Sequence, residues 1–128
     1  MRVLLDTHTL IWAVDDPGRL PPAAVVTLQN PANQLMVSAA TVWEVAIKTA
    51  IGKLSLSAPY RQWMTKALTD LGAAIVPVDV EYADRQAGLP FHHRDPFDRL
   101  LVAQALVESV PLVSGDAQFD LYGVMRIW

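Results

Sequence analysis

Cysteine is absent from the 128 residues of this chain, and its absence excludes several kinds of site. Without a thiol there is no disulfide, no zinc–thiolate finger, no cysteine-ligated iron–sulfur cluster and no cysteine nucleophile. A chain of this length buries roughly two-thirds of the surface that it exposes when unfolded, which is enough for one hydrophobic core. We therefore expect a single domain over residues 1–128 that folds without covalent cross-links.

Charge is also scarce in this sequence. Charged residues make up 18% of the chain and hydrophobic residues 52%, whereas an average soluble domain has about 25% charged residues. This composition excludes disorder. Four tryptophans and a mean hydropathy of +0.26 are hard to hide in one small core, so we expect another chain to cover some apolar surface. The net charge of −3 is the wrong sign for holding duplex nucleic acid by bulk electrostatics, unless the acids surround a metal and the basic residues lie elsewhere.

Long apolar runs are missing as well. The longest uncharged stretch, residues 20–43, contains three prolines along with asparagine and glutamine, which is unlike a bilayer span. The first residues reach Asp6 after only three apolar side chains, too few for the hydrophobic region of a signal peptide. We therefore expect a cytoplasmic protein.

Short apolar runs alternate with helical patterns along the whole chain, which is typical of an α/β domain with a mainly parallel sheet of four to five strands. The predicted strands are Val3–Leu5, Leu35–Val37, Ala74–Val76, Leu112–Val113 and a weaker one around Val124–Ile127. The predicted helices are Thr9–Val14, Pro22–Gln29, Ala39–Ile51, Tyr60–Leu71, Val80–Ala87 and Pro96–Val107. Capping residues such as Ser38 and Asp95 mark where two of these helices begin.

Two acids follow predicted strands. Asp6 comes directly after the first strand, and Asp116 comes after Ser114-Gly115 beyond the fourth. Ligands of open α/β sheets bind outside the carboxyl ends of the strands, so both acids point to the expected site. The alternative is that each acid only caps a helix, Asp6 that of Thr9–Val14 and Asp116 a short one through Gln118–Asp120.

Two further acids lie within apolar stripes of predicted helices. At about 100° per residue, Glu44 shares its face with Ala40, Ile47 and Ile51. Asp98 in the same way shares a face with apolar residues of the helix that follows Asp95. The alternatives are an exposed Glu44–Lys48 ion pair and a capping partnership of Asp98 with Asp95.

Four carboxylates gathered at strand ends and helix starts repel one another unless a cation lies between them. Oxygen ligands without thiolates suit Mg²⁺ or Mn²⁺. Such an ion can activate water at neutral pH and stabilise the leaving oxygen of a phosphodiester. The residues alone therefore predict a metal-dependent phosphoryl hydrolase.

Four segments also match known motifs in order and spacing over nearly the whole chain. They are Leu4–Trp12 (LLDTHTLIW), Val37–Lys48 (beginning VS and ending WEVAIK), His93–Ala105 (HRDPFDRLLVAQA) and Leu112–Phe119 (LVSGDAQF). With these segments the chain resembles the PIN-domain nucleases, and within them the VapC-type toxins of type II toxin–antitoxin systems.

The resemblance implies a PIN-like three-layer α/β/α sandwich, a Mg²⁺ or Mn²⁺ site, endoribonuclease activity on RNA, homodimerisation and inhibition by a cognate antitoxin. It also implies products with a 3′-hydroxyl and a 5′-phosphate. Carried over by position, Asp6, Glu44 and Asp98 resemble the acidic triad and Asp116 its fourth member. Roles around the metal or substrate are implied for Thr7, Ser114 and His8, with a hydrogen bond to the metal's surroundings expected for His8. Asp95 is expected mainly to cap the helix that carries Asp98, and a role as a metal ligand is the lesser alternative.

Basic residues must handle phosphate in this acidic chain, and Lys48, Arg94 and Arg99 are the candidates for contacts with the RNA backbone. The alternative is that they are ordinary solvated charges. His92 and His93 could line the same rim, although histidines are common in surface loops.

The tryptophans divide differently. Trp43 is expected in the core, and Trp12 and Trp63 either in the core or on a dimer or antitoxin surface. Trp128, the last residue, has no predicted place.

Other readings of the acids fit less well. A receiver-type signalling domain needs a lysine after its last strands, and a haloacid-dehalogenase-like phosphatase needs an aspartate where His8 stands. The remaining alternative is a catalytically silent PIN-like scaffold that binds an antitoxin or RNA, because carboxylates alone do not prove turnover.

Overall fold

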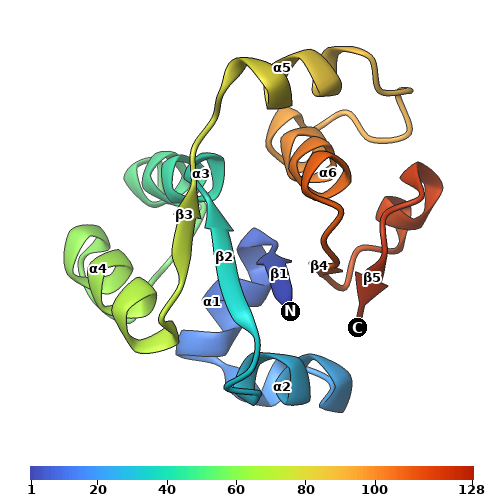
Figure 1. Cartoon of the computed structure of the whole chain (residues 1–128). Helices are drawn as coiled ribbons and strands as arrows, with labels where there is room; N and C mark the ends of the chain where they lie inside the picture. Colours follow the sequence, from blue (N-terminus) through green and yellow to red (C-terminus); the bar gives the residue numbers. More distant parts are fainter.

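Five short strands form one parallel sheet in the computed structural model, which describes residues 1–128 (Figure 1). The strand order is β3-β2-β1-β4-β5, and every neighbouring pair is parallel. The strands are β1 (Arg2–Leu5), β2 (Gln34–Ser38), β3 (Ala74–Val76), β4 (Leu112–Val113) and β5 (Arg126–Ile127). The predicted parallel sheet is confirmed, and β1 lies at its centre.

Alternation of side chains along the strands divides the core in two. In register, Leu4 pairs with Met36 and Leu112, and all three belong to one buried cluster. The next residue, Leu5, pairs with Val37 and Val113, and these belong to a second cluster. Since successive residues of a strand point to opposite faces, the two clusters lie on opposite sides of the sheet.

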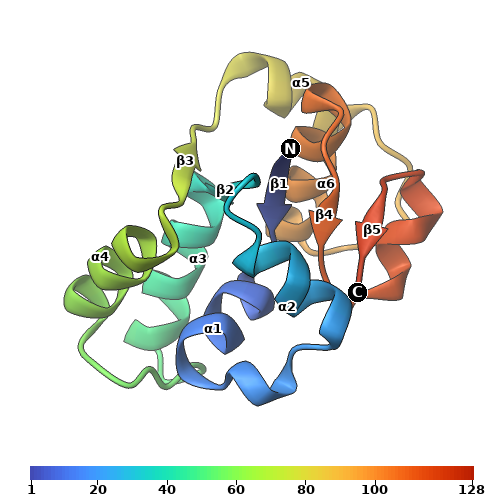
Figure 2. The same cartoon turned by 60° about the horizontal axis from the view of Figure 1, so that its bottom comes forward.

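Helices cover both faces and complete the three layers (Figures 1 and 2). Helices α1 (Thr7–Asp15), α2 (Pro22–Gln29) and α4 (Tyr60–Leu71) pack on the Leu5 side, and α5 (Val80–Ala87) and α6 (Pro96–Glu108) on the Leu4 side. Helix α3 (Ala39–Ala50) contributes to both clusters, and the short 3₁₀ helices are η1 (Pro17–Arg19) and η2 (Ala117–Tyr122). The predicted three-layer α/β/α sandwich is therefore confirmed. None of the helices combines the length and the apolar character that a membrane span requires.

Capping residues fix where the helices at the carboxyl edge of the sheet begin. Asp6 accepts a hydrogen bond from the Thr9 backbone N–H at 2.7 Å, so α1 begins at Thr7, two residues before the predicted start. Ser38 caps α3 from the end of β2 in the same way. Because each cap follows a strand directly, the strand end and the first helical turn are fixed together.

Two of the tryptophans, Trp43 and Trp63, differ in burial. Trp43 is 64% exposed and lies edge-on to Phe97, with ring centroids 5.7 Å apart, so the prediction of a core position is wrong. The reason is that Glu44, one residue further around α3, takes the inward position. Trp63 is only 2% exposed and donates its indole N–H to Asp15 at 2.9 Å, which places it in the core.

The C-terminal tryptophan packs against the start of the chain. Trp128 lies 5.9 Å from Trp12 between ring centroids, and its indole covers Gly115. A Cβ added at Gly115 would lie 2.9 Å from Trp128 Cε2. Glycine at this position therefore lets the turn before Asp116 pass beneath the indole.

Arg99 holds the loop between α5 and α6 from the inside. It is 5% exposed, and its guanidinium donates to the carbonyl oxygens of Pro90 at 2.8 Å, Gln86 at 3.0 Å and Leu89 at 3.3 Å. The Phe91 ring covers the guanidinium at 4.1 Å. The predicted contact of Arg99 with the RNA backbone does not fit this geometry, because its donors already serve three carbonyls in the interior.

We expect Arg99→Ala to destabilise the fold by roughly 2–4 kcal/mol, because it removes a buried side chain and leaves three carbonyls, that of buried Leu89 among them, without this donor. The matched control is Arg94→Ala, which removes an exposed arginine five residues earlier and should change stability by less than about 0.5 kcal/mol. Denaturant unfolding followed by circular dichroism measures both values. Equal stability of the two variants would contradict the structural role of Arg99.

Candidate functional site

The four predicted acids come from different elements and meet at the carboxyl edge of the sheet. Asp6 follows β1 and Asp116 follows β4, whereas Glu44 comes from α3 and Asp98 from the first turn of α6. The Asp6 backbone N–H donates to the Val113 carbonyl at 3.2 Å, so the ends of β1 and β4 lie side by side. The acids are buried or half-buried there.

Ser114 connects Asp6 to the turn that carries Asp116. Its hydroxyl donates to Asp6 Oδ2 and accepts the Asp116 backbone N–H at 3.0 Å. Asp6 Oδ1 meanwhile accepts the cap hydrogen bond of α1 from Thr9. Asp116 also caps a helix, since its Oδ1 accepts the Gln118 N–H at 2.9 Å. Asp6 and Asp116 therefore each cap a helix and also belong to the group of acids.

Glu44 is held by one hydroxyl and one ammonium. Its Oε1 accepts from the Thr7 hydroxyl at 2.5 Å, and its Oε2 accepts from Lys48 Nζ at 2.6 Å. The Thr7 hydroxyl also lies 3.3 Å from that of Thr41, a residue that sequence reasoning did not single out. Unlike the exposed pair considered from the sequence, this pair has Glu44 only 4% exposed.

The Lys48 ammonium is engaged with that pair. The hydrogen bond with Glu44 is the main cause that raises the pKa of Lys48, and nearby Asp95 and Asp98 add to it. The ammonium of Lys48 is therefore paired with an acid of the group, which makes it less available for a contact with an RNA phosphate.

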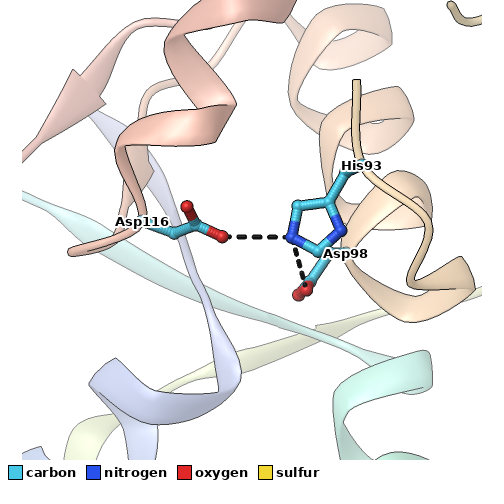
Figure 3. A group of neighbouring side chains, drawn as sticks. All are labelled: His93, Asp98 and Asp116. Carbon is cyan, nitrogen blue, oxygen red and sulfur yellow. Dashed lines mark hydrogen bonds and ion pairs between the residues drawn. The ribbon is translucent and has the colours of Figure 1, made fainter. Parts of the chain in front are cut away.

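His93 lies between two of the acids, Asp98 and Asp116 (Figure 3). Its Nε2 is 3.1 Å from Oδ2 of Asp98 and 3.1 Å from Oδ2 of Asp116. On the other side of the ring, Nδ1 accepts the Asp95 backbone N–H at 3.2 Å. With Nδ1 as an acceptor, Nε2 is the ring nitrogen that donates, and its hydrogen bond goes to Oδ2 of Asp116.

Two aromatic residues of η2 fix the position of His93. The ring stacks on Phe119, with centroids 5.9 Å apart and planes 18° from parallel. The backbone N–H of His93 donates to the Tyr122 hydroxyl at 2.8 Å. His93 belongs to a loop and its partners follow β4, so no local periodicity in the sequence pointed to this arrangement.

Asp98 is a half-buried acid with a raised pKa. Burial raises its pKa to about 7, and the negative charges of Asp95, Glu44 and Asp6 add to this effect, whereas His93 opposes it. Asp95 caps α6, as expected from the sequence, with its Oδ1 accepting from the N–H groups of Phe97 and Asp98.

The predicted residues are not all equally close. One ligand atom each from His93, Asp98 and Asp116 lies within 4.8 Å of the other two. Asp6 and Glu44 stand outside this tight group of three, although both act on the charge of Asp98. His8 is exposed and packs on Trp12 at 5.6 Å between ring centroids, without the hydrogen bond expected for it. Arg94 is exposed on the loop beside His93.

A divalent cation fits this set of side chains. The donors are carboxylate and hydroxyl oxygens with one imidazole, and there is no thiolate. Carboxylate oxygens suit Mg²⁺ and Mn²⁺. Burial is the main cause that raises the pKa of Asp98, and the neighbouring carboxylates of Asp95, Glu44 and Asp6 add to it, so a cation beside Asp98 would favour its ionised form.

In metal-free protein, we expect stability to fall as pH rises from about 4 to about 7, because folded Asp98 binds a proton in this range and the unfolded carboxyl does not. The stability advantage of Asp98→Asn over the wild type should be larger at pH 8 than at pH 5 by roughly 1–3 kcal/mol, because only the wild type loses this stability over that range. Urea unfolding with EDTA at the two pH values measures the difference. A variant that tracks the wild type at both would refute the assignment.

Comparison with known proteins gives the same family by sequence and by fold. The family model described as "PIN domain" matches residues 3–124. The chain is 30% identical over 115 residues to Ribonuclease VapC22 of Mycobacterium tuberculosis, covering 89% of this chain and 86% of the relative.

Solved structures share the architecture at lower identity. VapBC2 from Rickettsia felis, bound to a DNA fragment from its promoter, matches with a TM-score of 0.65 and 19% identity over 98% of this chain and 97% of the other. VapBC-1 from nontypeable Haemophilus influenzae matches with a TM-score of 0.66 and 18% identity over 98% and 96%. The family match, the relative's sequence and the shared fold together show that this chain belongs to the PIN domain family.

Proposed function

We propose that this chain is a metal-dependent endoribonuclease, with Mg²⁺ or Mn²⁺ as cofactor, and that it acts as the toxin of a type II toxin–antitoxin pair. The observation that carries the proposal is the group of acids at the carboxyl edge, with Asp98 and Asp116 facing one point and Asp6 and Glu44 beside them. The relative named as a ribonuclease, 30% identical over most of its length, supports RNA as the substrate.

The chain's own residues divide the work in this proposal. Asp6, Glu44, Asp98 and Asp116 hold the divalent ion, which supplies water activation and charge stabilisation at the phosphodiester when bound. Thr7 orients the Glu44 carboxylate and Ser114 that of Asp6 through the hydrogen bonds described above. Asp98 gives up its proton to become a ligand, so binding of the cation and ionisation of this carboxyl are coupled.

Contacts with RNA fall to a small number of basic side chains. Arg94 is exposed on the loop next to His93, and its guanidinium is the best placed for a phosphate. Lys48 is half-exposed but paired with Glu44, and Arg99 is interior. We therefore propose that Arg94 is the principal contact with the RNA backbone among the three predicted cations.

Other chains complete the proposed biological unit. Trp43 and Phe97, together with Ala40, Val78, Pro96 and Leu100, line an apolar hollow between α3 and α6. Large exposed aromatics act as anchors in protein interfaces. The solved relatives titled VapBC and FitAB support a cognate antitoxin as partner and, with the exposed apolar residues, we propose a homodimer in the cytoplasm, where RNA is available.

RNA cleavage tests the proposal directly. We expect purified, antitoxin-free protein to cut cellular RNA into discrete fragments with 5′-phosphate and 3′-hydroxyl ends, in Mg²⁺ or Mn²⁺ but not in EDTA. Asp98→Asn should reduce the rate by on the order of 100-fold or more, since loss even of an outer-shell partner costs up to about that much. The control Asp84→Asn, an exposed acid on α5, should cleave normally.

The silent scaffold predicts a different pattern. In that case the wild type and Asp98→Asn leave the RNA intact to the same degree, yet both still bind the antitoxin. Cleavage that persists in Asp98→Asn and in EDTA would instead mark a contaminating nuclease and refute the proposal.

Metal binding tests the ligand assignment without RNA. We expect Asp6→Asn to weaken Mn²⁺ binding about tenfold or more in titration calorimetry while its fold is kept, because Asn retains the Oδ1 acceptor that caps α1. Unchanged affinity in both Asp6→Asn and Asp98→Asn would contradict the site as assigned.

A further inference from the structure

The position of His93 raises a question that the acids alone do not answer. Its Nε2 lies at the same 3.1 Å from two carboxylate oxygens of different elements, one on α6 and one after β4 (Figure 3). Those oxygens and Nε2 all lie within 4.8 Å of one another. Carboxylate oxygens are the ligands that Mg²⁺ and Mn²⁺ prefer, so a cation held by both residues would be held at these oxygens. That is the point at which the imidazole is aimed.

His93 can relate to a cation there in two ways. As a ligand, Nε2 must present a lone pair, and the neutral ring must then carry its proton on Nδ1. As a hydrogen-bond donor, Nε2 keeps its proton, and the Nε2–H group occupies the place of the cation. The two arrangements need opposite tautomers of the same ring.

The backbone of Asp95 decides between these tautomers. Its N–H donates to Nδ1 of His93 at 3.2 Å, and an Nδ1–H group would meet this donor head-on. The Asp95 amide is fixed in turn, because the Asp95 side chain caps α6 through two hydrogen bonds. The surroundings therefore favour the tautomer with the proton on Nε2, which donates and does not ligate.

The ring is also held where it is by contacts unrelated to the acids. It stacks on Phe119, which is fully buried, and the His93 backbone is bonded to the Tyr122 hydroxyl. Arg99 holds the preceding part of this loop by donating hydrogen bonds to three of its backbone carbonyls. His93 thus enters the group of acids as part of a braced loop, and displacing the ring has a cost.

We propose that His93 is a positioning residue whose ring occupies the space between the Asp98 and Asp116 carboxylates, with Nε2 hydrogen-bonded to Asp116 and at ion-pair distance from Asp98, and that it competes with the divalent ion for this space. This inference rests on the proposed metal-dependent function. An ion held by Asp98 and Asp116 would require the imidazole to leave this space. His93 therefore lowers the affinity for the ion, and it fixes the positions of the two carboxylates when no ion is bound.

The affinity for Mn²⁺ alone, without RNA, tests the competition. We expect His93→Ala to bind Mn²⁺ about tenfold more tightly than the wild type in titration calorimetry. His93→Gln keeps an amide N–H donor at a similar reach and should stay near the wild-type affinity. The matched control is His92→Ala, because the neighbouring His92 ring packs on Tyr122 and not on the acids. Thermal unfolding of each variant checks that it is folded.

A spectroscopic readout separates a competing donor from a ligand. We expect the electron spin echo of Mn²⁺ bound to the wild type to show no modulation from a coordinated imidazole nitrogen. Weaker Mn²⁺ binding in His93→Ala, or nitrogen modulation that this variant loses, would overturn the proposal and make His93 a ligand. Equal affinity in the wild type and His93→Ala would overturn it as well.

The Asp98→Asn variant keeps this failure distinct from failure of the proposed function. If Asp98→Asn weakens Mn²⁺ binding while His93→Ala leaves it unchanged, the metal site stands and only the role of His93 falls. If neither the wild type nor any variant binds Mn²⁺, both inferences fall.

Discussion

Negative charge concentrated at one edge of a parallel sheet is the constraint around which the rest of the structure is arranged. Parallel strands end together, so the acids that follow β1 and β4 are brought side by side by the topology itself. Burial then makes each unpaired carboxylate costly. The structure meets this cost with local donors: the Thr9 amide and Ser114 hydroxyl for Asp6, and the Thr7 hydroxyl and Lys48 ammonium for Glu44. For Asp98, burial is the main cause of a raised pKa, and the negative charge of Asp95 adds to it.

The same side chains serve the fold and the candidate site. Asp6, Asp95 and Asp116 each accept hydrogen bonds from backbone N–H groups at the start of a helix. Capping fixes the direction of these carboxyl groups, so the geometry of the site follows from the way the helices begin. The alternatives of a structural cap and a functional acid therefore do not exclude one another. A single oxygen can satisfy the helix while the other faces the neighbouring acids.

The surface carries a second constraint, which the low charge content already indicated. Trp43 and Phe97 each directly precede an acid of the site, Glu44 and Asp98, and they form an aromatic pair in which Trp43 is exposed and Phe97 half-buried. On a helix, neighbouring residues are separated by about 100°, so turning the acid inward turns the aromatic outward. The exposed apolar surface is thus a geometric consequence of building the acidic group from helices. It also fits the proposed association with further chains.

The sequence by itself determined the strands, nearly all helix limits and the convergence of Asp6, Glu44, Asp98 and Asp116, because periodicity, caps and parallel strand ends are local signals. It missed Thr41, and it placed Trp43 in the core and Arg99 among the RNA contacts. Only the tertiary structure decided those positions. Helix α6 is buried continuously from Arg99 to Ala105, so a one-sided helical wheel does not describe it. His93 was likewise fixed only by the fold, since a loop has no periodicity and three of its partners, Asp116, Phe119 and Tyr122, lie 23 or more residues away.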